Sequence, residues 1–203
     1  MSDSRWLDWA REIAAHAQSA LAYDPDPYDR ERFERLRELA AEIVAAHSGL
    51  PQPQIADWFA AEQGYATPKV DVRMLVLRGD SLLLIKEQTD GRWALPGGWM
   101  DVGDSPAEAA ARELREEAGL EAQAVRLLGV FDNRRHGLVQ GPWHIIKLCF
   151  GCEADGEPTA GSEATAAGFF RLGALPELSL NRNTPQLIER LVALQRSGQA
   201  GFD

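Results

Sequence analysis

Apolar positions in the first third of the chain follow the period of amphipathic helices. They recur at spacings of three and four, which predicts helices over residues 6–21 and 29–47. Two prolines in YDPDPYD separate these runs, SGLPQP ends the second, and a short third helix is predicted over 54–63. We therefore expect residues 1–66 to form a small all-helical domain. Its thin core would pack on the rest of the chain or, equally, on a second copy.

From Val70 onward, the pattern changes to short apolar runs separated by turns. VDVRMLVLRGDSLLLIKE predicts two strands joined at Gly79-Asp80, and further strands are predicted over 93–95, 124–133, 143–153 and 168–172. The glycine-rich LPGGWMDVGD precedes a helix that ends near residue 118, and a last helix is predicted over 184–196. Residues 67–203 are therefore predicted to form an α+β domain with a mixed sheet.

Composition and charge narrow the class of protein. With 45% hydrophobic and 26% charged residues, the 203-residue chain has an ordinary globular composition. A net charge of -10 argues against nucleic-acid and membrane partners, and a site that handles phosphate would need a cation for screening. MSDSRWLDWA does not read as a signal peptide, no run approaches the roughly 20 apolar residues of a membrane span, and two cysteines make no disulfide framework. The expected location is the reducing cytoplasm.

The strongest candidate for chemistry is PAEAAARELREEAGL, residues 106–120. Glu113, Glu116 and Glu117 are spaced i, i+3 and i+4, so they share one face of a helix. Neighbouring carboxylates repel one another, and a hard divalent cation with oxygen ligands would offset that repulsion. Taken alone, such a pattern is more often a solvated acidic face. The preceding Gly-Gly loop, where backbone carbonyls can approach a metal ion, favours a metal site.

The same region resembles the signature motif of a known family. Gly98, Asp104 and RELREEAGL at 112–120 are spaced as in the Nudix box, a motif long enough that chance matches are rare. Asp104 departs from the family pattern, which has glutamate there. Its shorter side chain bears on any metal contact of that residue and not on the main site. The resemblance implies a Nudix α/β/α sandwich with a mixed sheet, preceded here by the helical domain, and a hydrolase that uses Mg²⁺ or Mn²⁺.

The resemblance also implies roles for individual residues of the box. Glu113 and Glu117 would be the principal metal ligands, Glu116 would share the same or a second ion, and the Gly97 carbonyl would be the backbone ligand. Glu116 and Glu117 would also be catalytic. Arg112 would join them by orienting the Glu113 carboxylate through a charge-assisted hydrogen bond.

The family often draws one more carboxylate from a loop outside the box. Glu163, in GSEATAAGFF just before a predicted strand, is the candidate for a further metal ligand or general base. A surface loop glutamate without function is an equal alternative. In the implied reaction, metal-activated water cleaves a pyrophosphate linkage and leaves two phosphorylated fragments.

Aromatic and basic side chains near the expected cleft are candidates for substrate recognition. Aromatic faces can stack on a base or hold a choline ammonium, and arginines can bind phosphate. The predicted substrate-binding residues are Trp99, Arg134, Arg135, His136 and His144, with Phe131 and Trp143 in the same group. For the aromatic residues, core or rim packing is the more frequent alternative. For the two arginines, a solvated turn is equally open.

Beyond the box, the resemblance extends over nearly the whole chain. The helical leader, GYATPKVDVR and LPELSLNRNT (residues 175–184) resemble a Nudix subgroup of CDP-choline pyrophosphatases and proteins labelled ADP-ribose pyrophosphatases. This implies a homodimer, formed with the help of the leader, that cleaves nucleoside diphosphate-X substrates, with CDP-choline-like ones favoured. The alternatives are ADP-ribose or another nucleotide sugar, a nucleoside triphosphate, and a non-catalytic Nudix sensor, against which the intact glutamates argue.

Overall fold

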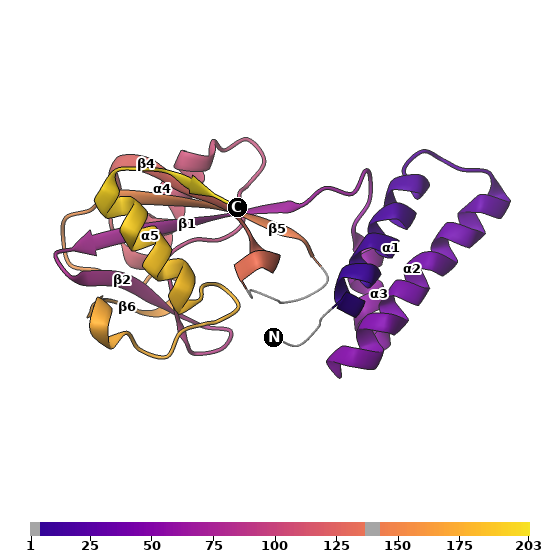
Figure 1. The fold of residues 1–203 in the computed structure, drawn as a ribbon, viewed down its shortest axis with the longest axis horizontal. Helices are drawn as coiled ribbons and strands as arrows, with labels where there is room; N and C mark the ends of the chain where they lie inside the picture. Colours follow the sequence, from indigo (N-terminus) through magenta and orange to yellow (C-terminus); the bar gives the residue numbers. More distant parts are fainter. Residues whose placement is uncertain (1–4, 137–142) are drawn as a thin grey trace. The chain divides into compact units, whose positions relative to one another are not determined.

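The structure is a computed structural model that describes residues 5–136 and 143–203 (Figure 1). The described residues divide into two compact units. The first runs to Pro68 and includes Trp143 and His144, and the second contains the other residues from Lys69 onward. In the described part of the chain, no helix combines the length and apolar character needed to cross a membrane.

The first unit is all-helical, as predicted. It contains α1 (Arg5–Leu21), α2 (Pro27–Ser48) and α3 (Gln52–Ala61). Asp26 caps α2 by accepting hydrogen bonds from two backbone N–H groups, and Gly49 ends it in the left-handed conformation. Small side chains let the helices approach closely, but they bury little apolar surface. The buried core consists of Leu7, Ala10, Ala14, Ala40, Ala41, Val44, Ile55 and Phe59.

The second unit is built on a mixed sheet, which confirms the predicted fold class. Its strand order is β3-β2-β1-β5-β4-β7, and β6 pairs with β2. The central pair β1·β5 is parallel, whereas β1·β2 and β4·β5 are antiparallel. The strands are β1 (Lys69–Arg78), β2 (Ser81–Glu87), β3 (Trp93–Ala94), β4 (Gln123–Asp132), β5 (Ile145–Glu153), β6 (Ala164–Arg171) and β7 (Gly201–Phe202).

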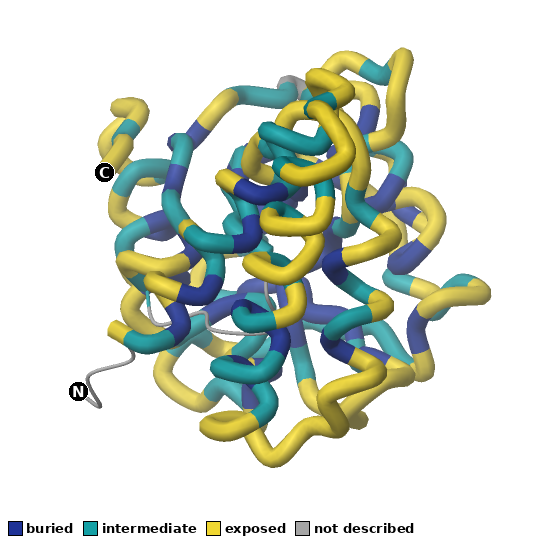
Figure 2. The backbone as a smooth tube through the Cα atoms, turned by 90° about the vertical axis from the view of Figure 1, so that its right-hand side faces the viewer, coloured by how far each residue is buried: buried dark blue, intermediate teal, exposed yellow. Residues whose placement is uncertain are grey.

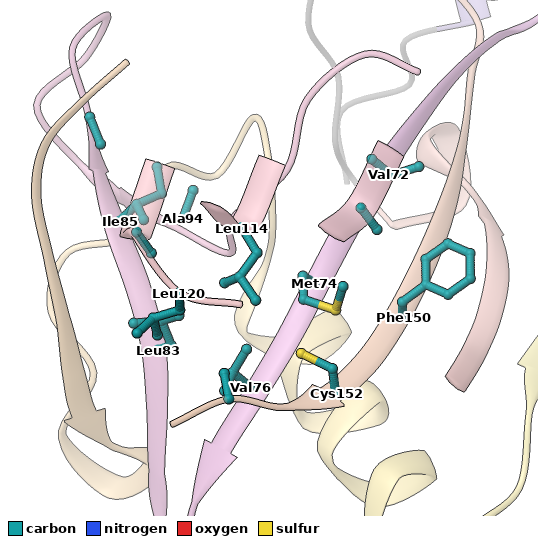
Figure 3. Packing of buried hydrophobic residues seen from close by; sticks show 14 of the residues in the cluster. Val72, Met74, Val76, Leu83, Ile85, Ala94, Leu114, Leu120, Phe150 and Cys152 are labelled. Carbon is teal, nitrogen blue, oxygen red and sulfur yellow. The ribbon is translucent and has the colours of Figure 1, made fainter. Parts of the chain in front are cut away.

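Helices cover both faces of this sheet. The apolar side of α4 (Pro106–Ala118) packs in one cluster with Met74 and Val76 of β1, and Figure 3 shows Leu114 among these residues. The apolar side of α5 (Pro185–Ser197) packs in a second cluster with Leu75 of the same strand. Neighbouring residues of β1 thus serve opposite layers, as the period of a strand requires. In Figure 2, exposed positions follow the loops and outer helix turns.

Several boundaries and burial expectations differ from the sequence prediction. The strand expected from 168 starts at Ala164, because the alanine-rich ATAA segment carries no β signal of its own and is placed by its pairing with β2. The short β7 was not predicted. Phe131, a candidate for substrate recognition, is fully buried in β4 and belongs to the α5-side core. That part of the prediction is wrong, and the core alternative holds.

Candidate metal centre

Local capping fixes where α4 begins and therefore which of its side chains face inward. The Ser105 hydroxyl accepts a hydrogen bond from the Glu108 backbone N–H, and the Glu108 carboxylate accepts one from the Ser105 N–H. From this start, Glu113 and Glu117 fall on the buried side, only 6% and 5% exposed. The Glu116 side chain is 42% exposed, so it lies at the rim and not beside them.

Three glutamates from two segments converge at the C-terminal half of α4. Carboxylate oxygens of Glu113, Glu117 and Glu163 all lie within 4.8 Å of one another. The structure thus brings the predicted loop glutamate to the two buried box glutamates, although they are at least 46 residues apart in sequence (163 − 117). Three convergent carboxylate oxygens suit a hard divalent cation.

The loop before Glu163 is held against the end of α4 by backbone contacts. The Thr159 N–H donates to the Ala118 carbonyl at 2.9 Å, and the Gly161 N–H donates to the Glu117 carbonyl at 3.3 Å. These bonds satisfy carbonyls that a helix end leaves unpaired. A Cβ at Gly161 would overlap the Glu116 carbonyl oxygen, so only glycine allows this approach. Loop and helix are thereby joined directly at the metal centre.

A second loop brings the backbone of Gly97 and Gly98 up to the same carboxylates. The Gly97 N–H donates to Glu117 Oε2 at 2.7 Å, and the loop pairs with β1 through a 2.9 Å bond from the Val72 N–H to the Gly98 carbonyl. Gly97 has φ +142°, and a Cβ there would overlap the Val72 carbonyl oxygen. A Cβ at Gly98 would lie 2.9 Å from a Glu113 oxygen. Gly97 therefore requires glycine, whereas a Cβ at Gly98 would displace the end of the Glu113 side chain.

The Gly97 carbonyl, predicted as the backbone metal ligand, has another partner in this structure. It accepts a hydrogen bond from Arg73 Nη1 at 2.5 Å. The group that reaches the carboxylates is the Gly97 N–H. The ligand role of this carbonyl therefore stays a prediction.

Arg112 is placed as expected for a residue that orients Glu113. Its guanidinium donates to Glu113 Oε1 at 3.0 Å and to Glu116 Oε2 at 3.1 Å. Nε donates to Asp104 at 3.2 Å, so the aspartate at the family's glutamate position contacts Arg112. Burial works against the charge of Arg112, but Asp104, Glu116 and Glu113 outweigh it and raise its pKa above the ordinary value. Arg112 thus stays charged and neutralises the outer side of the cluster.

The two buried carboxylates are difficult to ionise in the metal-free protein. Burial raises the pKa of Glu117 to about 7, with a further contribution from Glu113, although the Gly97 N–H and Arg73 oppose the shift. Burial also raises the pKa of Glu113, against the effect of Arg112. A cation among these groups would favour their charged forms. The donor set and its electrostatics therefore fit a divalent metal ion.

Two family models match consecutive parts of the chain. Residues 67–191 match the NUDIX domain, and residues 4–59 match a domain described as UDP-X-like, N-terminal oligomerisation domain. The chain belongs to the Nudix family. These matches confirm the predicted family and enzyme class, a Nudix hydrolase. Members of this family generally need divalent cations, in agreement with the carboxylate cluster.

Similar proteins include relatives along the full length of this Nudix chain. YjhB of Bacillus subtilis (strain 168), whose name proposes an ADP-ribose pyrophosphatase, is 42% identical over 93% of the chain and 91% of its own length. A solved UDP-X diphosphatase is 34% identical, with a TM-score of 0.62 over 100% of this chain and 99% of that one. A solved ADP-ribose pyrophosphatase from Streptococcus suis 89-1591 is 37% identical, with a TM-score of 0.59 over 68% of this chain and all of that one.

Charged residues buried behind the Nudix site were not predicted. Arg73 pairs with Asp71 at 3.2 Å, and Lys147 Nζ contacts the same Asp71 oxygen at 2.5 Å. Glu87 is buried at the end of β2 and pairs with Arg182. The signal in the sequence was a charged residue inside an otherwise apolar strand, as in VDVRMLV and IIKLCF. Such residues are rarely buried unless they are paired.

The segment LPELSLNRNT (residues 175–184) pairs with β3, the strand that comes just before the Gly97 loop. The Trp93 N–H donates to the Glu177 carbonyl at 3.0 Å, and the Ser179 N–H returns a 2.8 Å bond to the Trp93 carbonyl. The Asn183 side-chain oxygen accepts from the Leu95 N–H at 2.8 Å. This segment therefore helps to position the strand that leads into the metal centre.

The predicted substrate-binding residues of the second unit come from two separate segments of the chain. Trp99 is half exposed and forms an isolated bridge with Asp71. Arg134 pairs with Asp132 at 2.6 Å, and the His136 ring contacts Asp203 at 2.9 Å. Arg135 is exposed on the same 3-10 turn as Arg134 and His136 (Asn133–His136), whereas Trp143 and His144 group with the first unit. Their roles in recognition therefore stay predictions.

The close approach at Gly161 gives a stability prediction. Gly161→Ala should lower the free energy of unfolding by about 1–3 kcal/mol, because the new methyl group overlaps a backbone carbonyl that cannot move independently. Gly173→Ala is the matched control, since a Cβ there meets nothing within 4 Å and its φ is not positive. Urea unfolding of both variants measures the difference. Equal midpoints would show that the loop does not contact the end of α4.

The raised pKa of Glu117 gives a pH-dependent prediction for the metal-free protein. Its carboxyl holds a proton more tightly in the folded than in the unfolded chain, so its stabilising contribution is full below about pH 4.5 and is lost as pH rises through about 7. With EDTA at pH 8, Glu117→Gln should be more stable than the parent by up to about 3 kcal/mol. At pH 5 the gap should nearly close. Thermal unfolding at both pH values tests this, and a gap independent of pH would contradict it.

Proposed function

We propose that this chain is a metal-dependent pyrophosphatase that hydrolyses the pyrophosphate linkage of nucleoside diphosphate-X substrates. The observation that carries the proposal is the convergence of Glu113, Glu117 and Glu163 within 4.8 Å beside the glycine loop. These three side chains would hold Mg²⁺ or Mn²⁺, with Glu116 at the rim as a further ligand. When bound, the cation lowers the pKa of a bound water and stabilises charge on the leaving phosphate.

Residues of the chain itself would orient the metal-binding carboxylates and accept the proton from water. Glu117 is held by the Gly97 N–H through one oxygen, which leaves its other oxygen for the metal centre. Arg112 keeps the Glu113 carboxylate oriented from the opposite side. Glu163 is exposed and adjoins the buried pair, so it can accept a proton from water and pass it to solvent. We therefore propose that Glu163 contributes one carboxylate oxygen to the cation and serves as the general base through the other.

The substrate class rests on resemblance and on similar proteins. The sequence pattern favours CDP-choline-like substrates, whereas the names of similar proteins carry ADP-ribose and UDP-X. All three share a nucleoside joined through a pyrophosphate to a second group. A site that acts on the shared diphosphate is consistent with each of them. Trp99 and Arg135 are exposed and are the proposed contacts to the base and the phosphates.

A substrate panel tests the reaction. The full chain, with Mg²⁺ or Mn²⁺, is incubated with CDP-choline, ADP-ribose, UDP-glucose, a diadenosine polyphosphate and a nucleoside triphosphate, and phosphate-ester products are quantified. We expect nucleoside diphosphate-X substrates to be cleaved fastest. Glu117→Gln and Glu163→Gln should each lower kcat by about 100-fold or more, because each removes a carboxylate from the metal or the water.

Glu121→Gln provides the control for these variants. Glu121 is exposed and lies just beyond α4, outside the carboxylate cluster. The kcat of the Glu121→Gln variant should therefore equal that of the parent. If Glu117→Gln cleaves the best substrate at the parent rate, the site assignment is wrong. If nucleoside triphosphates are cleaved fastest, the proposed substrate class is wrong.

We also propose that the first unit mediates a homodimer. The match to an oligomerisation domain supports this proposal, as does the alanine-rich core, which leaves large side chains exposed. Trp9, Tyr28 and Leu36 are among these exposed residues. Contact with a second copy would bury them and add apolar surface to a core that has little of its own.

Removal of the first unit tests the dimer. A chain lacking residues 1–66 should be monomeric by light scattering, while the full chain should have twice its formula mass. Trp9→Ala in the full chain should weaken the dimer without unfolding it, because the side chain is exposed within one copy. A persistent dimer after the deletion would refute this role for the first unit.

A further inference from the structure

Arg73 lies behind the carboxylate cluster and contacts the loop that reaches it. It is only 4% exposed and extends from the middle of β1. Its Nη1 donates to the Gly97 carbonyl at 2.5 Å and to the Leu95 carbonyl at 3.3 Å. One guanidinium thus holds two carbonyls of the segment that connects β3 to α4. A planar group with several donors is suited to this task.

The Arg73 guanidinium is itself fixed by a second buried pair. Its Nη2 donates to Asp71 Oδ2 at 3.2 Å, and the same oxygen accepts from Lys147 Nζ at 2.5 Å. Asp71 and Lys147 are register partners in the parallel pair β1·β5, so the sheet sets their separation. The position of Arg73 is therefore determined by the central strands and not by a mobile loop.

From Arg73 the contacts continue to a proposed metal ligand in one further step. The carbonyl of Gly97 is held by Arg73, and the N–H of the same residue donates to Glu117 Oε2 at 2.7 Å. Gly97 is confined between β1 and Glu117, since a Cβ there would overlap the Val72 carbonyl. A shift of the Gly97 carbonyl would therefore reorient the N–H that holds Glu117.

Stability alone does not account for a buried arginine at this position. A buried ion pair is costly to desolvate, and well-packed apolar residues of similar volume are often as stable or more stable. The contacts of Arg73 instead connect it, through Gly97, to the carboxylate cluster. Arg78, on the same strand, offers a contrast, because its guanidinium also binds two backbone carbonyls, those of Ala154 and Gly156, but in a loop outside the cluster.

We propose that Arg73 is a positioning residue for the metal centre. By holding the Gly97 carbonyl, it directs the Gly97 N–H at Glu117 and so sets where that carboxylate lies relative to Glu113 and Glu163. The inference rests on the proposed function, because it assumes that these carboxylates bind a divalent cation. Arg73 contacts neither substrate nor metal in this role.

The test compares Arg73→Met and Arg73→Lys with Arg78→Met and Arg78→Lys in the full chain. Mn²⁺ affinity is measured without substrate by electron paramagnetic resonance, and the Gly97 amide resonance is recorded by NMR in the metal-free protein. Arg73→Met should weaken Mn²⁺ binding by about 10- to 100-fold, as loss of an outer-sphere partner does. Arg73→Lys should fall between it and the parent, because lysine keeps the charge without the planar fork. Both Arg78 variants should bind Mn²⁺ within about twofold of the parent, since second-sphere effects are local.

The outcomes separate a positioning role from a structural one. Equal Mn²⁺ affinities in the Arg73 and Arg78 variants, measured where all are folded, would overturn the proposal. If Arg73→Met does not fold, the two lysine variants decide in the same way. If the parent binds no Mn²⁺, or if Glu117→Gln binds it equally well, the proposed function fails instead. In that case the Gly97 amide resonance still tests whether Arg73 positions Gly97. The resonance should shift in Arg73→Lys and stay unchanged in Arg78→Lys.

Discussion

Two glutamate side chains of one helix are buried next to each other, and much of the second unit is arranged around this unfavourable contact. Glu113 and Glu117 are one helical turn apart and both face the sheet. Burial disfavours their charged forms, and Glu113 makes Glu117 harder still to ionise. A sequence selected for stability alone would place apolar residues here. Retaining two carboxylates in this position makes sense for a protein that needs their charge for a cation.

Backbone groups and fixed charges around Glu113 and Glu117 offset this unfavourable contact. Glycine at 97 lets one loop approach β1, and glycine at 161 lets the other approach α4, so closely that a Cβ would overlap a backbone carbonyl. One loop supplies an N–H to Glu117, and the other supplies the third carboxylate, Glu163. Arg112 donates a hydrogen bond to Glu113, and the charge of Arg73 acts on both buried glutamates. These two arginines thus offset part of the negative charge of the cluster.

The part of this arrangement that could be predicted from the sequence is the part encoded locally. The glycine loop, the capped helix and its glutamates all lie within residues 97–118 of the chain, and the long motif made their relation clear. Even there, the spacing of the apolar residues does not show which side of the helix is buried. Ala107 is exposed and Ala109 is buried, because α4 turns Glu113 and Glu117 toward the sheet and not toward solvent. An apolar-face argument assumes that carboxylates lie outside, and an active site inverts that assumption.

The unpredicted residues depend on pairings between distant segments. Lys147 meets Asp71 only because β1 and β5 are parallel neighbours, and Arg182 meets Glu87 only because the segment 175–184 returns to β3. Neither pairing leaves a local pattern, although a charged residue within an apolar strand signals that a partner exists. The same reasoning separates catalysis from recognition in this fold. The carboxylates are fixed by sheet, helix and glycine contacts, whereas Trp99 and Arg135 are exposed on a loop and a short turn. Under the proposed function, substitutions at those two positions would alter which substrate binds while the carboxylate cluster keeps its geometry.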